Sequence, residues 1–231
     1  MTDEAESLAE QREARYVSNR IGELFEKPLA GRFDVAHLKA THAHIFQDLP
    51  HHRPGIVRAD TDDGWIKHRS LEGQSAAYAV HYAHRDVEEK IRGILREFGG
   101  SVSLRGLGLE DAAHRIAQLY GALDHAHGFY EGNSRTLREF TRALAADAGY
   151  ALDWVKAGVG GKERNELYIA RDVAVLERAF PGLSAERAMV TSDRGEYEAW
   201  FVLVGLRRAM GGRSLEAIIR DGLVLRRRRS G

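Results

Sequence analysis

The residues best suited to chemistry lie in one short segment, which runs from His127 to Arg138 and reads HGFYEGNSRTLR. This segment holds a histidine, a glutamate, a Gly-Asn pair and two arginines. His127 lies four residues after Leu123, an apolar position of a strongly periodic stretch, so we expect it on the buried face at the end of that helix. A histidine in such a place can act as a general base.

The loop after the histidine has the residue types of an anion-binding turn. Gly132 permits positive φ, and Asn133 tolerates the left-handed region better than most side chains do. Such a loop can turn its backbone N–H groups inward as an anion nest, and the start of the following helix adds the positive end of its dipole. The loop therefore predicts a site for a negatively charged group.

Two arginines and one carboxylate indicate what that group could be. Arg135 and Arg138 are three residues apart and lie on one side of a helical turn, and a guanidinium suits bidentate contact with phosphate. Glu131 fits an otherwise cationic site if it binds Mg²⁺. The segment favours polyphosphate binding beside a general base, although each of its elements alone also occurs in ordinary turns and solvated helix faces.

The rest of the chain predicts an all-α fold that positions this segment between two helices. Only four prolines occur, and none interrupts a long periodic stretch. The cleanest helical face runs from Glu110 to His125, and Thr136 and Glu139 have the spacing of a capping box for the next helix. Asp34 is a candidate N-cap. Further helices are expected at about 4–25, 34–49, 75–98, 163–180, 184–190, 195–210 and 213–221.

The segment from His51 to Gly73 does not follow the helical pattern. It contains two short β-like runs, Ile56-Val57-Arg58 and Trp65-Ile66-Lys67, on either side of an Asp/Gly-rich turn. Two such runs around such a turn are typical of a β-hairpin. The sequence therefore predicts a helical bundle with one small hairpin.

The composition is that of a globular protein. The 231 residues are 43% hydrophobic and 29% charged, acidic and basic residues balance at 34 each, and there is no cysteine. Disulfides and cysteine chemistry are thereby excluded, and no nucleic acid or membrane partner is predicted. Met1 to Arg15 lacks the apolar run of a secretory signal, and the most apolar stretch, Ala199 to Leu206, is far shorter than the ~20 residues that span a bilayer. We expect a soluble, cytoplasmic protein.

Histidines and a basic run are the remaining features that could carry a function. Arg226 to Arg229 is expected to be a solvated tail rather than a nucleic-acid site. None of the close histidine pairs has the helical spacing and glutamate of a zinc protease, so the sequence does not favour a zinc site. These pairs are His42/His44, His51/His52, His81/His84 and His125/His127.

The order and spacing of the chemical segment resemble the signature of the Fic family, His-x-Phe-x-(Asp/Glu)-Gly-Asn-x-Arg-x-x-Arg. Gly31 to Leu38 looks like an early helix start of that family, and 54–58 with 65–68 lies where the family places a target-docking hairpin. The resemblance implies a single Fic domain over 1–231, with a core at about 20–180 and a C-terminal helical extension at about 181–225. The matching residues are His127, Phe129, Glu131, Gly132, Asn133, Arg135 and Arg138.

This resemblance implies a protein adenylyltransferase that moves AMP from ATP to a Ser, Thr or Tyr hydroxyl of a target protein. His127 would be the general base and Glu131 the Mg²⁺ ligand, while Phe129 would anchor the loop in the core. Gly132, Asn133 and Ser134 would form the anion nest, and Arg135 and Arg138 would neutralise the β- and γ-phosphates. The hairpin would pair with the target backbone through Ile56, Val57, Arg58, Trp65, Ile66 and Lys67.

Two positions depart from the family pattern. Gly128 replaces the usual proline after the histidine, and Ser134 replaces the usual second glycine. Serine costs little there if the position has helical φ, and it would distort the nest if the position needs positive φ. Two alternatives stay open: a catalytically weak Fic domain that binds nucleotide or a partner, and the transfer of another phosphoryl-containing group.

Many Fic enzymes carry an inhibitory helix with the pattern (Ser/Thr)-x-x-x-Glu-(Gly/Asn), whose glutamate pairs with the second motif arginine, here Arg138. This chain has two partial matches: Thr2 to Glu6 is followed by serine, and Ser192 to Glu196 is followed by tyrosine. Neither is complete. We therefore expect the inhibitory helix to come from a separate small antitoxin-like protein, and this chain to be the toxin of such a pair.

Overall fold

The computed structural model describes residues 2–70, 77–155, 164–209 and 213–226. These residues confirm the predicted all-α fold with a small hairpin, because helices dominate and the described strands form two short antiparallel pairs. In chain order the helices are α1 (Thr2–Glu26), α2 (Val35–Phe46), α3 (Val87–Phe98), α4 (Leu109–Ala126), α5 (Asn133–Asp147), α6 (Arg164–Ala179), α7 (Ala185–Val190), α8 (Arg194–Ala209) and α9 (Leu215–Gly222), with 3₁₀ turns η1 (Pro50–His52) and η2 (Ser101–Leu104).

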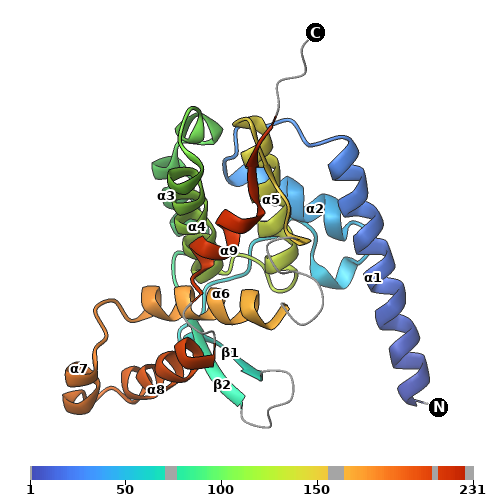
Figure 1. The fold of residues 1–231 in the computed structure, drawn as a ribbon. Coiled ribbons are helices and arrows are strands. Elements are labelled where there is room, and N and C mark those ends of the chain that lie inside the picture. The colour runs from blue at the N-terminus through green and yellow to red at the C-terminus, as the bar shows by residue number, and fades with distance from the viewer. Residues whose placement is uncertain (1, 71–76, 156–163, 210–212, 227–231) are drawn as a thin grey trace.

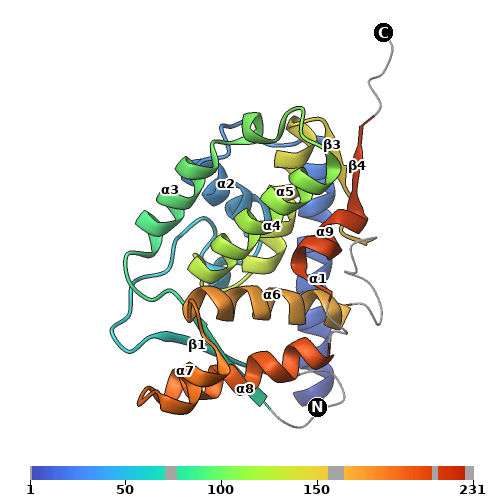
Figure 2. The ribbon, with the colours of Figure 1, turned by 60° about the vertical axis from the view of Figure 1, so that its left-hand side comes forward.

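Helix α4 is the centre of the bundle. Its apolar residues recur at helical spacing and are buried, and α3, α5, α6 and α9 all pack against it. Figure 1 shows α6 crossing below α4 and α5, and Figure 2 shows α9 beside α4 from a second direction. The chemical segment at 127–138 therefore joins the end of this central helix to α5 and includes the first turns of α5.

The N-terminal helices pack beside α5. Asp34 caps α2 as predicted, since its Oδ1 accepts a hydrogen bond of 3.0 Å from the backbone N–H of His37. Helix α1 packs along α2, and its Val17 and Leu24 share a buried cluster with Phe46. Figure 1 shows α1 as the outermost helix on that side of the molecule.

Helix α5 begins earlier than predicted, so the capping box at its start was wrong. The helix starts at Asn133, and Thr136 and Glu139 both lie inside it. The Thr136 hydroxyl donates to the Gly132 carbonyl at 3.1 Å, and Glu139 forms an ion pair with Arg142. Because Gly132 occupies the cap position with φ +78°, the turn needs no side-chain cap.

The hairpin exists, but it uses different strands from those predicted. Strand β1 (Trp65–Ser70) pairs antiparallel with β2 (Ala77–Tyr82), from Trp65 opposite Tyr82 to Ser70 opposite Ala77. Ile56-Val57-Arg58 is not a strand, because the polar contacts of Arg58 direct this stretch across the end of α4. The helix predicted from about 75 begins only with α3, and the alternation of Tyr78, Val80 and Tyr82 in β2 is the period-two signal that was overlooked.

The C-terminal helices agree with their predicted ranges, and one strand pair there was not predicted. Strand β3 (Tyr150–Leu152) pairs antiparallel with β4 (Leu223–Leu225), which brings the end of α9 beside the end of α5. Most of the basic run at 226–229 lies outside the described residues. No helix within the described ranges combines the length and apolar character that a bilayer-spanning segment needs.

Candidate active site

A pocket of about 660 Å³ opens where α4 ends and α5 begins, with β1 on one side and α6 on the other. Its lining carries five Lys or Arg side chains and one carboxylate, so its field favours an anionic ligand. The lining residues are Lys67, His68, Arg69, His127, Glu131, Gly132, Asn133, Ser134, Arg135, Arg138, Leu167, Tyr168 and Arg171.

His127 lies at the end of α4 in the left-handed conformation, with φ +48°. Its backbone N–H donates to the Leu123 carbonyl at 3.1 Å, and its ring lies 4.0 Å from the Tyr82 ring between centroids. The residue is 3% exposed, and neither ring nitrogen has a hydrogen-bond partner among the described residues. Burial, and next the positive charges of Lys67 and Arg69, lower its pKa well below the ordinary value. The imidazole is therefore neutral at neutral pH and can accept a proton.

Arg58 clamps the chain on either side of His127. The residue is 2% exposed, and its guanidinium donates to the carbonyls of His127 at 2.7 Å, Ala126 at 3.2 Å and Ala83. The Arg58 backbone N–H donates to the Gly128 carbonyl at 2.9 Å. The bonds to Ala126 and His127 satisfy carbonyls at the end of α4 that have no partner within the helix. The prediction that Arg58 docks a target is corrected: its side chain is buried under the histidine.

The turn between the helices is held by Gly132 and Asn133. A side chain at Gly132 would place its Cβ 2.2 Å from the ring of Phe46, in addition to the strain of positive φ. The Asn133 side chain forms two hydrogen bonds with the backbone of Phe129, accepting at 2.9 Å and donating at 2.6 Å. The predicted nest residue Asn133 therefore braces the loop with its side chain.

His42 of α2 supports the same turn from below and was not predicted from the sequence. The Gly55 N–H donates to its Nδ1 at 2.9 Å, so Nε2 carries the proton and donates to the Glu131 carbonyl at 3.1 Å. The ring stacks on Phe129 with 3.9 Å between centroids, and burial lowers the pKa of His42 to about 4. Phe129 is 2% exposed, in agreement with the predicted anchoring role.

The N-terminus of α5 opens onto the pocket at Ser134. The N–H groups of the first helical turn have no acceptor in their own helix, because the Thr136 N–H makes the first bond, to Gly132. Ser134 lies inside the helix, so its φ is helical and the departure from glycine does not distort the turn. Its hydroxyl oxygen accepts from Arg138 at 3.0 Å and from Arg171 at 2.9 Å. Serine here joins two arginines in one network.

Arg171 of α6 is a pocket residue that sequence reasoning missed. It is 1% exposed and forms a bidentate ion pair with Asp124 of α4, at 2.9 Å and 2.8 Å. Asp124 is the largest influence that raises the pKa of Arg171, against the opposing effect of burial. The two residues are 47 positions apart, so no local pattern could have paired them. The pair fixes α6 against α4 and directs one guanidinium N–H at Ser134.

Strand β1 is fixed to α6 by a second buried group. The Tyr78 hydroxyl donates to Asp172 at 2.8 Å, and Arg69 lies 3.3 Å from the other carboxylate oxygen. Burial raises the pKa of Asp172 to about 6. Arg69 also donates to the Tyr82 hydroxyl at 2.6 Å, and Tyr82 packs on His127. The hairpin is therefore attached to the pocket by polar contacts from both of its strands.

Glu131 lies at the mouth of the pocket, where its side chain makes few contacts. Its side chain is 64% exposed, and Oε1 lies 3.3 Å from the Lys67 ammonium. One accessible carboxylate beside a helix N-terminus and several cationic groups fits the usual environment of a nucleotide-bound Mg²⁺, which takes one or two carboxylates plus phosphate oxygens. The residues present therefore suit Mg²⁺ when a polyphosphate is bound.

The pocket brings together most of the predicted site residues and leaves out most of the predicted hairpin residues. His127, Glu131 and the predicted phosphate residues all line it, and Lys67 does so from β1. Ile56, Val57, Arg58, Trp65 and Ile66 are not among its lining residues, and Ile66 is 45% exposed on β1. The lining residues that were not predicted come from β1 and α6: His68, Arg69, Leu167, Tyr168 and Arg171.

Comparison with known families identifies this segment. The model of the Fic/DOC family matches residues 32–145, which include α2, α4 and most of α5. Residues 32–145 belong to the Fic/DOC family. The Fic segment thus holds His127 to Arg138 complete, and it excludes α1 and α6, although α6 supplies three lining residues of the pocket.

Curated relatives of the Fic segment are named protein adenylyltransferases. The chain is 31% identical over 145 residues to protein adenylyltransferase VbhT of Bartonella schoenbuchensis, covering 63% of this chain and 28% of that protein. It is 27% identical over 137 residues to a protein adenylyltransferase of Bartonella henselae, covering 57% of this chain and 24% of that protein. The chain therefore spans less than a third of the length of either relative.

Solved structures of Fic domains share the fold. An N-terminal Fic domain of a VirB-translocated Bep effector from Bartonella quintana, with bound ADP, matches at a TM-score of 0.60 and 21% identity over 94% of this chain and 85% of that one. BepC of Bartonella tribocorum, with bound AMPPNP, matches at 0.61 and 19% identity over 94% and 87%. At these identities the likeness extends the Fic fold over nearly the whole chain and says nothing of its chemistry.

Proposed function

We propose that this chain is a protein adenylyltransferase that transfers AMP from ATP to a hydroxyl side chain of a target protein. The observation that carries the proposal is His127: a buried, neutral imidazole without a hydrogen-bond partner among the described residues, on the wall of a cationic pocket beside the start of α5. The curated relatives of the Fic segment are named for this activity.

In the proposed reaction, His127 accepts the proton of the target hydroxyl as its oxygen attacks the α-phosphate of ATP. The new bond joins that oxygen to phosphorus, the bond to the bridging oxygen of the β-phosphate breaks, and pyrophosphate leaves with the electron pair. The negative charge of bound ATP offsets the cations around His127, so nucleotide binding raises the pKa of the imidazole toward a range useful for catalysis.

The phosphates would bind at the start of α5. The free N–H groups of its first turn and the helix dipole favour negative charge there. Arg138 and Arg135 would contact the β- and γ-phosphates, while Ser134 and Arg171 keep Arg138 at the helix surface. Glu131 would hold Mg²⁺, which supplies neutralising charge between the phosphates when it is bound.

The target would add a strand to the hairpin. Within the described residues β1 pairs with β2 only, and Lys67, His68 and Arg69 of β1 line the pocket. A peptide that pairs with the other edge of β1 would place a hydroxyl beside His127. This assigns target docking to residues 65–70 and removes Ile56, Val57 and Arg58 from that role.

A small antitoxin-like partner would act on Arg138. In the part of the chain that the structure describes, this guanidinium donates to Ser134 and forms no ion pair with a carboxylate. A glutamate supplied by a partner would compete with the phosphates for it. The first motif arginine differs, because Arg135 lies 3.9 Å from the carboxylate of Glu13.

Intact-mass spectrometry after incubation with Mg·ATP and lysate proteins tests the proposed activity. We expect one AMP unit on a target in the presence of the wild-type chain and none with His127→Ala. Because His127 has φ +48°, His127→Asn is the matched variant: asparagine tolerates that conformation and has no basic ring nitrogen. Both variants should still bind ATP.

The same measurement distinguishes the alternatives. A gain of one phosphate would assign transfer of a different group. ATP binding without any adduct, across lysates that contain hydroxyl targets, would assign a nucleotide-binding module. Full adenylylation by His127→Asn would refute the role of His127 as the base.

A further inference from the structure

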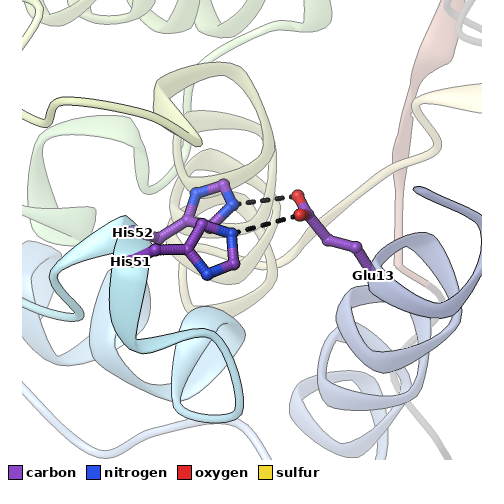
Figure 3. A group of neighbouring side chains, drawn as sticks. All are labelled: Glu13, His51 and His52. Atoms are coloured by element: carbon purple, nitrogen blue, oxygen red, sulfur yellow. Dashed lines mark hydrogen bonds and ion pairs between the residues drawn. The ribbon is translucent and has the colours of Figure 1, made fainter. Parts of the chain in front are cut away.

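Three side chains outside the pocket converge on one point. Glu13 of α1 faces His51 and His52 of η1, and Figure 3 shows both imidazoles pointing at the carboxylate. His52 Nε2 lies 2.9 Å from Oε1 of Glu13, and His51 Nε2 lies 3.3 Å from Oε2. All three ligand atoms lie within 4.8 Å of one another. The chain thus presents two nitrogen donors and a carboxylate to the same small volume.

This arrangement has the dimensions of a first coordination shell. Tetrahedral Zn²⁺ with bonds of 2.0–2.1 Å keeps neighbouring ligand atoms about 3.3 Å apart. The two histidine–glutamate separations, 2.9 Å and 3.3 Å, are close to that value, and all three ligand atoms lie within 4.8 Å of one another, so side-chain rotations can bring them around one ion. Imidazole and carboxylate together select borderline transition cations rather than Ca²⁺ or Mg²⁺. We propose that Glu13, His51 and His52 form a binding site for a divalent transition-metal ion of the Zn²⁺ class.

The two histidines have different surroundings: His52 is buried and fixed in direction, and His51 is exposed to solvent. His52 is 5% exposed, and its ring is stacked on Phe46 at 4.8 Å, which fixes the direction of its Nε2. His51 has 65% of its side chain exposed, so an ion can approach from solvent. Three protein ligands leave at least one coordination position for water. Such a site exchanges its metal and is not a closed structural one.

The surroundings of the Nδ1 atom of His52 determine how tightly we expect the site to bind a metal ion. Metal binding at Nε2 requires the proton on Nδ1, and Nδ1 is buried without a hydrogen-bond partner among the described residues. Metal-bound histidines usually donate that N–H, and loss of such a contact weakens metal sites about 10- to 100-fold. We therefore expect the affinity for the metal to be lower by that factor than at a site where the N–H of each histidine ligand has an acceptor.

The position of the site connects α1 to the pocket. Arg135, a proposed phosphate ligand, lies 3.9 Å from the same Oε1 of Glu13 that His52 contacts. A bound cation would take over that carboxylate and leave Arg135 to its cation–π contact with Phe46. Metal occupancy would thus fasten α1 to η1 and remove the carboxylate that competes with a phosphate for Arg135.

To test the proposal, the full chain is first treated with a chelator and then titrated with Zn²⁺ in competition with a chromophoric chelator. A second titration with Co²⁺ records the visible spectrum of a tetrahedral site. No nucleotide is present, so the result does not depend on the proposed transfer reaction. We expect one ion per chain. His51→Ala and Glu13→Gln should each weaken binding at least about tenfold, since each removes a ligand.

The chain offers a matched control in a second histidine–glutamate pair, which joins α1 to α2. His44 Nε2 of α2 lies 3.0 Å from Oε2 of Glu23 of α1, and no third metal-binding side chain joins this pair within the described residues. His44→Ala should bind Zn²⁺ as the wild type does. The proposal is overturned if the wild type binds no Zn²⁺, if His51→Ala binds it equally well, or if His44→Ala loses affinity to the same extent.

Discussion

The floor and the rim of the pocket are built in opposite ways. The floor, formed by His127, Gly132, Asn133 and Arg171, is buried and is held by hydrogen bonds, ion pairs and close packing. The rim, formed by Lys67 and Glu131, is more exposed, and Glu131 makes one ion pair with its side chain. Substitutions in the floor should therefore change both the stability of the fold and the activity. Substitutions in the rim should change ligand binding alone. Substitutions can test this difference.

The largest expected effect on stability is that of Gly132→Ala in the floor. The added Cβ meets the Phe46 ring at 2.2 Å at a position with φ +78°, and we expect a cost of about 2–5 kcal/mol from strain and overpacking. Gly64→Ala is the matched control, because Gly64 has φ +88° with open space around its Cβ position. Denaturant unfolding should show about 1–2 kcal/mol for the control. Equal losses in the two variants would contradict a packed floor.

Arg58→Met, directly beneath the floor, should have the next largest effect. It leaves the carbonyls of His127, Ala126 and Ala83 without their donor, and it also removes the cost of burying a charged guanidinium, which offsets part of the loss of these hydrogen bonds. We expect a loss of about 3 kcal/mol in unfolding free energy and a lower kcat, because the backbone of the base is released. Arg58→Lys should rescue little, since an ammonium cannot replace the fork geometry. A loss below about 0.5 kcal/mol would show that Arg58 is not a clamp.

Glu131→Gln tests the rim. Its unfolding free energy should stay within about 0.5 kcal/mol of the wild-type value, because the carboxylate is 64% exposed and its ion pair is at the surface. The Mg²⁺ concentration for half-maximal adenylylation should rise about tenfold or more, because the ion loses its protein carboxylate. An unchanged Mg²⁺ requirement would remove Glu131 from the metal site, and a large loss of stability would erase the distinction between floor and rim.

The smallest expected effect needs no substitution and concerns the pH dependence of kcat/KM of the wild-type chain. Burial and nearby cations lower the pKa of His127 in the folded protein without nucleotide, so the imidazole stays neutral as the pH falls through the ordinary range of histidine. The acidic limb of kcat/KM, which reports the free enzyme, should therefore lie below pH 6.5. An acidic limb at or above that pH would mean that the base is more exposed than the pocket floor allows.

The parts that the sequence predicted are those determined by neighbours along the chain. The ranges of most helices, the Asp34 cap and the spacing from His127 to Arg138 all depend on residues within a few positions of each other. The helical φ of Ser134 follows from an early start of α5, which the Gly132 cap explains in retrospect.

The missed parts depend on contacts between distant residues. Arg171 meets Asp124 across 47 positions, and Arg58 meets His127 across 69, so neither role leaves a periodic or spacing signal. A run such as Ile56-Val57-Arg58 has β-like side chains, yet the buried carbonyls at the end of α4 determine where it goes. The Glu13–His51–His52 cluster joins residues 38 and 39 positions apart, so its two histidines alone gave no reason to expect a third ligand.

The packing of α9 against α4 has a consequence for synthesis of the chain. Leu215, Ile218 and Ile219 of α9 share one buried cluster with Ile116 and Tyr120 of α4. On the ribosome, α9 emerges about 90 residues after the end of α4, a delay on the order of ten seconds at typical elongation rates. During that interval the nascent chain carries an uncovered apolar helix face, which is the kind of surface that aggregates and that chaperones bind.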